Sequence, residues 1–223
     1  MPHPPLLDTV DEATREALLG AGALRRYRKG SWLFHEGDPA RHVFVVTEGI
    51  IKIQKVSESG RVSVLGFREA GCLIGEQSAL DGEPTIASAV ALIDSVAVVV
   101  PAPRFLEMLS ASAGLATALL QQMNRRLRQS ARLLHDVSTA DAVTRVANRL
   151  VDLTADSTAP RAVPTRLQLP VSQQDLAEWA GLSREAVVRA LRVLRDEGII
   201  ETGRLKVVVL DPVALAARGH LEA

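Results

Sequence analysis

The hydrophobic periodicity of the chain changes near residue 100, and this change limits the folds that the sequence can adopt. From about residue 23 to residue 100, short β-rich runs such as HVFVV, IIKIQKV and VSVLGF alternate with glycine-containing turns. Many short strands at this spacing are typical of an antiparallel barrel or jelly roll. The turns carry glycines at positions 37, 49, 60, 71 and 82, where a positive φ is needed. Helical periods follow Pro103, so the sequence predicts an α+β fold with a β-roll first and helices after it.

A long proline-free stretch, residues 112–137, predicts the longest helix. Small or apolar residues recur in it at alternating spacings of four and three, which is a heptad seam. The seam consists of Ala116, Leu120, Met123, Leu127, Ser130, Leu134 and Val137. So narrow a stripe favours pairing with a second copy of the chain, and these residues are the predicted dimer interface. The alternative is a helix that lies on its own domain.

Residues 171–198 predict two short helices joined by a tight turn. Ser172 and Asp175 have the spacing of a capping box that opens the first helix. Gly181 breaks that helix, as the turn of a helix-turn-helix requires, and Ser183 caps the second helix. Before this pair, a further helix is predicted through VTRVANRLVDL, and the Pro-rich segment that follows it is predicted to be a loop.

The second helix of the pair has one aliphatic and one charged face. Val187, Leu191 and Leu194 share the face that must be buried. The charged residues are Arg184 at the N-terminal tip and Glu185, Arg189 and Arg192 on the opposite face. Residues 184–195 hold four Arg and one Glu, a local charge of +3. Because arginine can bond two acceptors of guanine and glutamate can accept from the cytosine amino group, this face predicts reading of bases in a DNA groove. The alternative is an ordinary solvated helix face.

The segment IIETGRLKVVVL predicts a hairpin that turns at Thr202–Gly203, with Arg204 and Lys206 beside its tip. A basic hairpin after the second helix indicates a winged helix whose wing contacts DNA phosphates.

Composition excludes several other classes of function. Lys+Arg and Asp+Glu are equal at 26 each, so a polyanion must be bound by a local patch. Cys72 is the single cysteine, which rules out an internal disulfide and an all-cysteine metal site within one chain. We find no nucleotide-binding glycine loop, nucleophile elbow or zinc-protease motif, and we predict neither an enzyme nor a metal site. With no signal-peptide pattern and no long apolar run, we expect a soluble, cytoplasmic protein.

The chain resembles the Crp/Fnr superfamily of bacterial transcription regulators, named for the cyclic-AMP receptor protein. The similarity extends in order through FHEGDPARHVFVVTEGIIKI, REAGCLIGEQSALDGEPTIASAVA, RRLRQSARLL and LSREAVVRALRVL. It implies a β-roll sensor domain over residues 1–111, a dimerisation helix over 112–137 and a winged helix-turn-helix over 138–223. It also implies double-stranded DNA, a second copy of the chain and RNA polymerase as partners. The implied DNA contacts are Ser172, Gln174, Ser183, Arg184, Glu185, Arg189, Arg204 and Lys206.

The resemblance also implies a ligand pocket in the β-roll, but the sequence departs from the family there. Cyclic-nucleotide binders carry Gly-Glu and later Arg followed by Ser or Thr; here Gly75-Glu76 is present, but Thr85 and Ile86 replace the later pair. Thr85 cannot neutralise a cyclic phosphate, so cyclic AMP in its usual pose is not the expected effector. The candidate pocket residues are Ile74, Gly75, Glu76, Thr85, Ile86, Arg126, Leu127 and Ser130. Glu76 could contact a ribose or pair with Arg126.

Three hypotheses follow. The favoured one is a homodimeric DNA-binding transcription regulator with an unidentified nucleotide or other small-molecule effector. The second is a regulator that is always competent for DNA and needs no ligand. The third is a sensor module that does not act through DNA; the charged face of the second helix argues against it.

Overall fold

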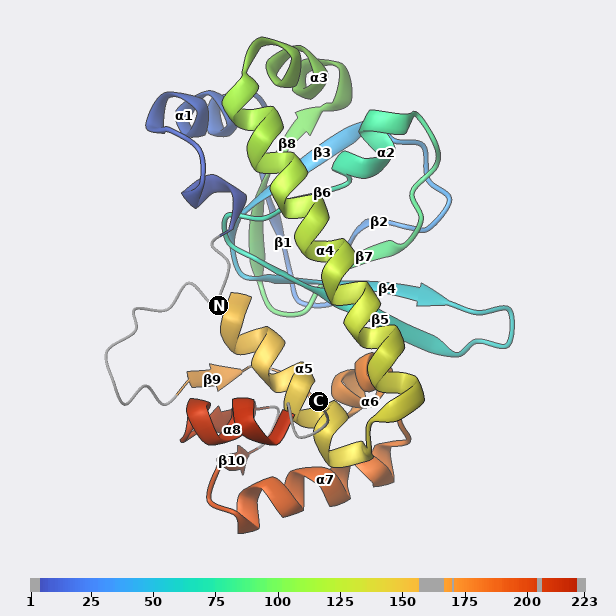
Figure 1. The fold of residues 1–223 in the computed structure, drawn as a ribbon. Helices are drawn as coiled ribbons and strands as arrows, with labels where there is room; N and C mark the ends of the chain where they lie inside the picture. Colours follow the sequence, from blue (N-terminus) through green and yellow to red (C-terminus); the bar gives the residue numbers. More distant parts are fainter. Residues whose placement is uncertain (1–4, 157–166, 170, 204–205, 220–223) are drawn as a thin grey trace. The chain divides into compact units, whose positions relative to one another are not determined.

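The computed structural model describes residues 5–156, 167–169, 171–203 and 206–219, and the chain divides into two compact units (Figure 1). The N-terminal unit runs from residue 4 to residue 126, and the C-terminal unit contains residues 127–223. Each unit buries its own set of apolar side chains.

Two antiparallel sheets form the N-terminal unit. Their strands are β1 (Ala23–Tyr27), β2 (Trp32–Phe34), β3 (His42–Glu48), β4 (Ile50–Val56), β5 (Val62–Glu69), β6 (Leu73–Ile74), β7 (Ser88–Ala91) and β8 (Ser95–Pro101). The sheet orders are β1-β8-β3-β6 and β2-β7-β4-β5, so strands that follow one another in sequence often lie in different sheets. The predicted α+β fold that begins with a β-roll is confirmed.

Gly49 makes the sharp change of sheet between β3 and β4 possible. Its φ is +86°, and a Cβ atom there would lie 2.2 Å from the Ser95 hydroxyl oxygen. The five glycines predicted to need a positive φ all have one. Sequence alone therefore located these turns correctly.

Strand β3 explains why the run HVFVV is apolar on both faces. Phe44 and Val46 point between the two sheets and pack with residues of β4, β6, β7 and β8. Val43 and Val45 point the other way, into a second core that is covered by helices. Because side chains alternate along a strand, a strand buried on both faces must be apolar throughout.

Helices cover the outer face of the β1-β8-β3-β6 sheet. They are the 3-10 turn η1 (Leu6–Asp8), α1 (Glu12–Gly20), α3 (Ala102–Ala111) and the first part of α4 (Ala113–Thr139); α2 (Glu76–Asp81) follows β6. Leu115, Ala118 and Leu119 of α4 are 0–3% exposed in this core. The first turns of α4 therefore do lie on their own unit, as the alternative for this helix proposed.

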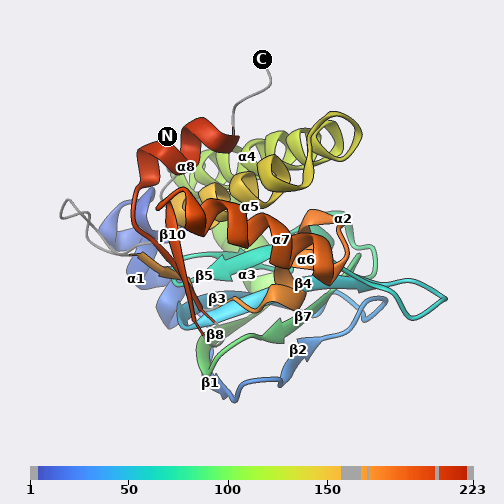
Figure 2. The same ribbon diagram turned by 90° about the horizontal axis from the view of Figure 1, so that it is seen from below.

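The C-terminal unit is a small bundle with a three-stranded sheet. Its elements are α5 (Ala142–Asp156), β9 (Leu167–Leu169), α6 (Gln173–Ala180), α7 (Arg184–Asp196), β10 (Ile200–Gly203), β11 (Lys206–Val209) and α8 (Pro212–Gly219). Helix α5 packs against α6, α7 and α8 (Figure 2). The sheet order is β10-β11-β9.

Three features of the C-terminal unit were predicted wrongly or not at all. The Pro-rich segment predicted to be a loop contains β9, whose Leu169 pairs with Val207 of β11. Helix α8 was not predicted. Thr202 and Gly203 are paired within the β10–β11 ladder, so the prediction that the hairpin turns at these two residues is wrong.

Candidate functional site

The pair α6 and α7 forms as the capping residues predict. The Ser172 hydroxyl oxygen accepts from the Asp175 N–H at 3.0 Å, and the Asp175 carboxylate accepts from the Ser172 N–H at 3.2 Å. Gly181 ends α6 in the left-handed conformation with φ +63°. The Ser183 hydroxyl oxygen then accepts from the Ala186 N–H at 3.2 Å and opens α7. The predicted helix-turn-helix geometry is confirmed.

Helix α7 presents its charged face to solvent because its aliphatic face is fully used in the core. Val187, Leu191 and Leu194 are at most 3% exposed. Arg184, Glu185, Arg189 and Arg192 are all exposed. Arg192 and Arg195 lie within 4 Å of the Asp196 carboxylate. Arg184 and Arg189 form no such ion pair with any residue that the structure describes, so both guanidinium groups are free to meet an external acceptor.

Glu185 remains an acceptor across the neutral range. Its carboxylate accepts from its own backbone N–H and from the Ser183 hydroxyl, and this lowers its pKa below the ordinary value. The nearby charges of Arg184 and Arg189 lower the pKa further. The N-terminal end of α7 thus offers two cationic donors and one anionic acceptor side by side.

Arg145 of α5 braces the turn between the two helices. Its guanidinium donates to the carbonyl oxygens of Ala180 and Gly181, with a separation of 3.1 Å for Gly181. These are the carbonyls that the end of α6 leaves without a helical partner. This residue was not predicted, because an arginine far upstream carries no local sign of what it caps.

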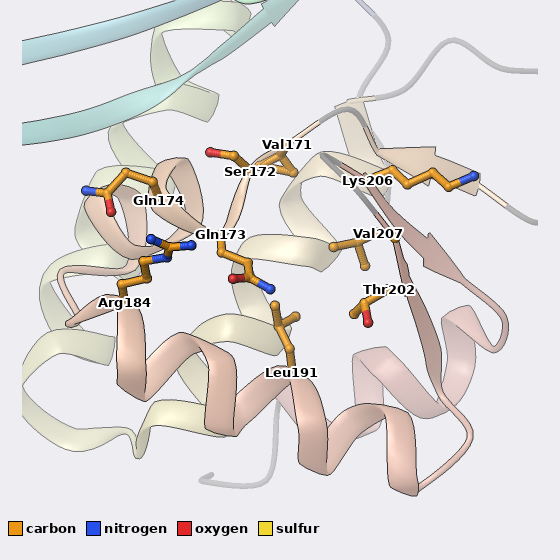
Figure 3. A pocket seen from close by; sticks show the side chains of 10 residues that line it. Val171, Ser172, Gln173, Gln174, Arg184, Leu191, Thr202, Lys206 and Val207 are labelled. Carbon is orange, nitrogen blue, oxygen red and sulfur yellow. The ribbon is translucent and has the colours of Figure 1, made fainter.

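A groove of about 350 Å³ lies between the start of α6, helix α7 and the β10–β11 hairpin (Figure 3). Four of the predicted DNA contacts line it: Ser172, Gln174, Arg184 and Lys206. The Arg184 side chain points toward α6, the Gln173 side chain extends into the groove, and Lys206 extends outward from its rim (Figure 3). Gln173 and Thr202 also line the groove and were not predicted. Arg204 lies outside the described residues.

Two of the predicted phosphate contacts already have partners within α6. The Ser172 hydroxyl, besides its capping bond, lies 2.5 Å from the Asp175 carboxylate. The Gln174 side-chain amide donates to the Glu178 carboxylate at 2.9 Å. The Asp175 N–H is taken by the Ser172 cap, but the N–H groups of Gln173 and Gln174 precede it in the first turn, where a helix offers no carbonyl partner.

In the β-roll, Thr85, one of the predicted pocket residues, is hydrogen-bonded within the fold. The Thr85 hydroxyl donates to the His35 carbonyl at 2.6 Å, and the Thr85 N–H donates to the Asp38 carbonyl at 2.9 Å. Thr85 is 8% exposed, whereas the Ile86 side chain is 57% exposed. Ile74 is buried between the sheets. Thr85 thus fastens its segment to the loop at residues 35–38.

Glu76 and Arg126 form an ion pair, as one of the two alternatives for Glu76 proposed. Arg126 also donates to the Leu73 carbonyl at 2.8 Å. Glu76 is 1% exposed, and its second carboxylate oxygen, Oε2, has no hydrogen-bond partner among the described residues. Gly75 precedes it with φ +84°, and a Cβ atom there would lie 3.0 Å from the His42 carbonyl oxygen.

Comparison with known proteins gives the same division of the chain into a β-roll and a helix-turn-helix. Residues 24–112 match the cyclic nucleotide-binding domain family, and residues 144–218 match the Crp-like helix-turn-helix domain family. The chain belongs to the Crp/Fnr superfamily. It is a Crp/Fnr-type transcription regulator with a helix-turn-helix DNA-binding domain, and not an enzyme.

Relatives with different names are about equally similar to this Crp/Fnr regulator. The transcriptional activator protein Anr of Pseudomonas aeruginosa is 28% identical over 97% of this chain and 86% of its own length. The cAMP-activated global transcriptional regulator Vfr of the same species is 26% identical over 93% of this chain and 96% of its own length. The solved structure of the c-di-GMP-responsive global regulator CLP of Xanthomonas campestris has a TM-score of 0.73 and 26% identity, covering 89% of this chain and 99% of CLP.

The predicted dimer seam of this Crp/Fnr regulator is exposed along most of α4. Leu120, Leu127, Leu134 and Val137 are 52–74% exposed, and Ser130 is exposed as well. Met123 and Ala116 are half-buried, and Met123 packs on the helical core of its own unit. Leu127 and Ser130, which were also predicted as pocket residues, belong to the C-terminal unit, unlike the rest of the predicted pocket.

A buried cation joins the end of α4 to the bundle of the C-terminal unit. The Arg149 guanidinium donates to the Asp136 carboxylate at 2.7 Å and lies 2.9 Å from the Asp152 carboxylate. The same group lies over the Trp179 ring, 5.4 Å from its centroid. Arg149 is 3% exposed. This regulator therefore fixes the connection from α4 to α5 with a cluster that was not predicted.

The described part of the chain has neither a membrane-spanning helix nor a metal-binding cluster. None of its helices is long and apolar enough to span a membrane. Its His, Cys, Asp and Glu side chains form no group of three or more that could hold a metal ion.

Proposed function

We propose that this regulator acts as a homodimer that reads a near-palindromic DNA site. The two copies of α7 would enter successive major grooves, about 34 Å or one helical turn apart. The observation that supports this best is the end of α7 itself, where Arg184 and Arg189 are exposed and form no ion pair with the described residues, while the opposite face is buried. RNA polymerase is the further partner that the family resemblance implies.

Base reading is proposed for three residues of α7. Arg184 and Arg189 would donate to the O6 and N7 acceptors of guanine, and Glu185 would accept from the cytosine amino group. Hydrogen bonds from its own backbone N–H and from the Ser183 hydroxyl, together with the charges of the two arginines, lower the pKa of Glu185, which suits an ionised acceptor. Together they would recognise G·C pairs in each half-site.

Phosphate contacts are proposed for the groove beside α7. Lys206 extends from its rim, and the start of α6 offers unpaired N–H groups at the positive end of the helix dipole. Because the Ser172 hydroxyl and the Gln174 amide already have partners, we assign the contact at Ser172 and Gln174 chiefly to the backbone of this first turn. Ser183 and Arg204 complete the proposed contacts, Ser183 from the cap of α7.

Selection of bound duplexes from a random DNA pool by the purified protein tests the base-reading proposal. Arg189→Ala should weaken binding to the selected site by about 1–3 kcal/mol and relax the preference at one base pair. Arg195→Ala removes the same unit of charge from the far end of α7 and is the matched control, which should keep the sequence preference. Equal losses on selected and random duplexes for Arg189→Ala would contradict base reading.

Dimerisation through the exposed stripe of α4 is the second part of the proposal. Burying one leucine side chain contributes about 1.5–3 kcal/mol. In a symmetric dimer, Leu120, Leu127 and Leu134 would be buried in both protomers. Sedimentation equilibrium should give the mass of two chains, and Leu127→Glu should shift the mass toward one. A single-chain mass at micromolar concentration for the wild type would refute it.

An effector other than cyclic AMP is the third part of the proposal. The Thr85 hydroxyl is engaged with His35, and the exposed Ile86 carries no donor, so the usual phosphate ligands are missing. The buried Oε2 of Glu76, which has no partner among the described residues, favours a polar ligand that brings a hydroxyl or amino donor. Such a ligand would shift the population of DNA-competent dimers by acting on the connection between α4 and α5 at residues 137–141.

Calorimetric titration with cyclic AMP, cyclic GMP and cyclic di-GMP tests the ligand proposal. Loss of the charge-assisted contact to a phosphate costs about 2–5 kcal/mol. Cyclic AMP should therefore bind this protein tens- to thousands-fold more weakly than it binds a protein that has arginine at the position of Thr85. Sub-micromolar cyclic AMP binding would contradict it. Full operator affinity of the ligand-free protein, unchanged by any nucleotide, would favour the regulator that needs no effector.

A further inference from the structure

An aliphatic side chain stands in the middle of the charged face of α7. Val188 is 43% exposed. It lies four residues after Arg184 and four before Arg192, and Arg189 follows it in the sequence. Residues four apart lie above one another on a helix, so Arg184, Val188 and Arg192 form one ridge. This ridge begins at the end of α7 that is proposed to meet the bases.

The fold does not need a valine at this position. The buried face of α7 is complete with Val187, Ala190, Leu191 and Leu194, none more than 3% exposed. An exposed β-branched residue also lowers helix propensity, since its χ1 angle is restricted. The same restriction favours binding, because the two methyl groups of a helical valine are already held in one orientation and lose little side-chain entropy in a contact.

The base edges in the major groove offer one apolar group, the 5-methyl of thymine. Val188 has no hydrogen-bonding atom in its side chain, so it can distinguish bases there only by contact with that methyl or by excluding a polar edge. We propose that Val188 reads the 5-methyl group of a thymine that neighbours the G·C pairs contacted by Arg184, Glu185 and Arg189. This inference rests on the proposed function and adds the chemical class of one further base.

Deoxyuridine substitution in the selected duplex isolates the methyl group. Deoxyuridine pairs with adenine as thymine does and differs only by the missing methyl, so hydrogen bonding is unchanged. The full-length protein is titrated with duplexes in which each thymine of both half-sites is replaced in turn. One thymine per half-site should show about fourfold weaker binding when replaced, since burying one methyl contributes about 0.8 kcal/mol.

Val188→Ala removes both γ-methyl groups and improves helix propensity, so the helix should be retained. In this variant the penalty for deoxyuridine at that thymine should fall to less than twofold, while the salt dependence of binding stays the same. Val193→Ala is the matched control, because Val193 is 37% exposed on the same helix. It lies about 140° around the helix from Val188 and nearer its C-terminal end, and it should keep the fourfold penalty.

The outcomes separate this inference from the function on which it rests. Tight, salt-dependent binding to a selected duplex with no methyl-sensitive thymine would overturn the role of Val188 and leave DNA recognition intact. A penalty that is the same in the wild type and in Val188→Ala would overturn it equally. Failure of the wild type to select any duplex would overturn both.

Discussion

Substitution of Arg149 by methionine tests whether the buried cluster at the end of α4 holds the C-terminal unit together. Arg149→Met keeps an unbranched side chain of similar length and removes the cation. Arg149 is 3% exposed, and its guanidinium contacts the carboxylates of Asp136 and Asp152 at 2.7 and 2.9 Å. The variant would leave two poorly solvated carboxylates next to an apolar side chain.

The expected loss of stability is large because both partners stay behind. Removing one partner of a buried ion pair costs about 3–5 kcal/mol, since the remaining charge is uncompensated. The contact of the guanidinium with the Trp179 ring adds about 1–2 kcal/mol when it is desolvated. For a domain of 60–100 residues, 1 kcal/mol shifts the midpoint of thermal unfolding by about 4–8 °C. A decrease of at least about 15 °C is therefore expected.

Thermal unfolding of the full chain, followed by circular dichroism, measures this shift. The double variant Asp136→Leu with Arg149→Met is the informative comparison, because it removes the cation and also one of the two carboxylates that would be left without it. It should recover part of the lost stability, although each single variant is destabilised. A decrease below about 4 °C for Arg149→Met, or a double variant less stable than both single ones, would refute the reasoning.

Three further predictions concern single positions. The Asp141 carboxylate accepts from the Thr144 N–H at 2.7 Å, and this bond lowers the pKa of Asp141 below 3.8 in the folded chain. Asp141→Ala should lower the free energy of unfolding by about 1 kcal/mol at pH 7. In thermal unfolding experiments, the difference between wild type and variant should disappear as the pH falls below about 4. Gly181→Ala must place a Cβ at φ +63°, so it should cost about 1–2 kcal/mol and weaken binding to the selected duplex. Thr85→Val removes the hydroxyl that donates to His35, and should lower the unfolding free energy of the N-terminal unit by about 1 kcal/mol while base preference stays the same.

The helix-turn-helix was predictable because its signals are local. The caps Ser172 and Ser183, the break at Gly181 and the aliphatic stripe of α7 all act within a few residues of one another. Each signal agrees with the next, so the periodicity alone fixes which face of α7 is exposed. The same is true of the turns in the β-roll, where a positive φ demands glycine.

The elements and contacts that were missed depend on distant residues. Strand β9 exists through its pairing with β11, about 40 residues later, and its three residues are too few for their alternation to predict a strand. Arg145 and Arg149 look like ordinary charges on an amphipathic helix, yet one caps α6 and the other is buried between two carboxylates. An arginine is buried when partners from other elements meet it, and a sequence does not state which elements meet.

Helix α4 carries the predicted seam on one set of residues and packs on its own unit with another set. The heptad pattern selected Leu120, Leu127 and Leu134, and these are exposed. Leu115 and Leu119 stand outside that pattern, and they are the ones buried in the helical core of the N-terminal unit. One helix therefore carries two apolar stripes at different angles, and a search for a single period finds only one of them.

At Thr85, the sequence predicted the missing charge but not the hydrogen bonds that the residue makes within the fold. Sequence predicted that no cation would meet a phosphate at Thr85, which concerns chemistry and needs no coordinates. It did not predict that the hydroxyl turns to the His35 carbonyl while the neighbouring N–H binds the Asp38 carbonyl. A buried hydroxyl must find an acceptor within the fold when no ligand supplies one. An effector that binds beside Glu76 must therefore either leave the hydrogen bond from Thr85 to His35 intact or supply Thr85 with another acceptor. In the second case, one buried hydrogen bond has to break before the new one forms.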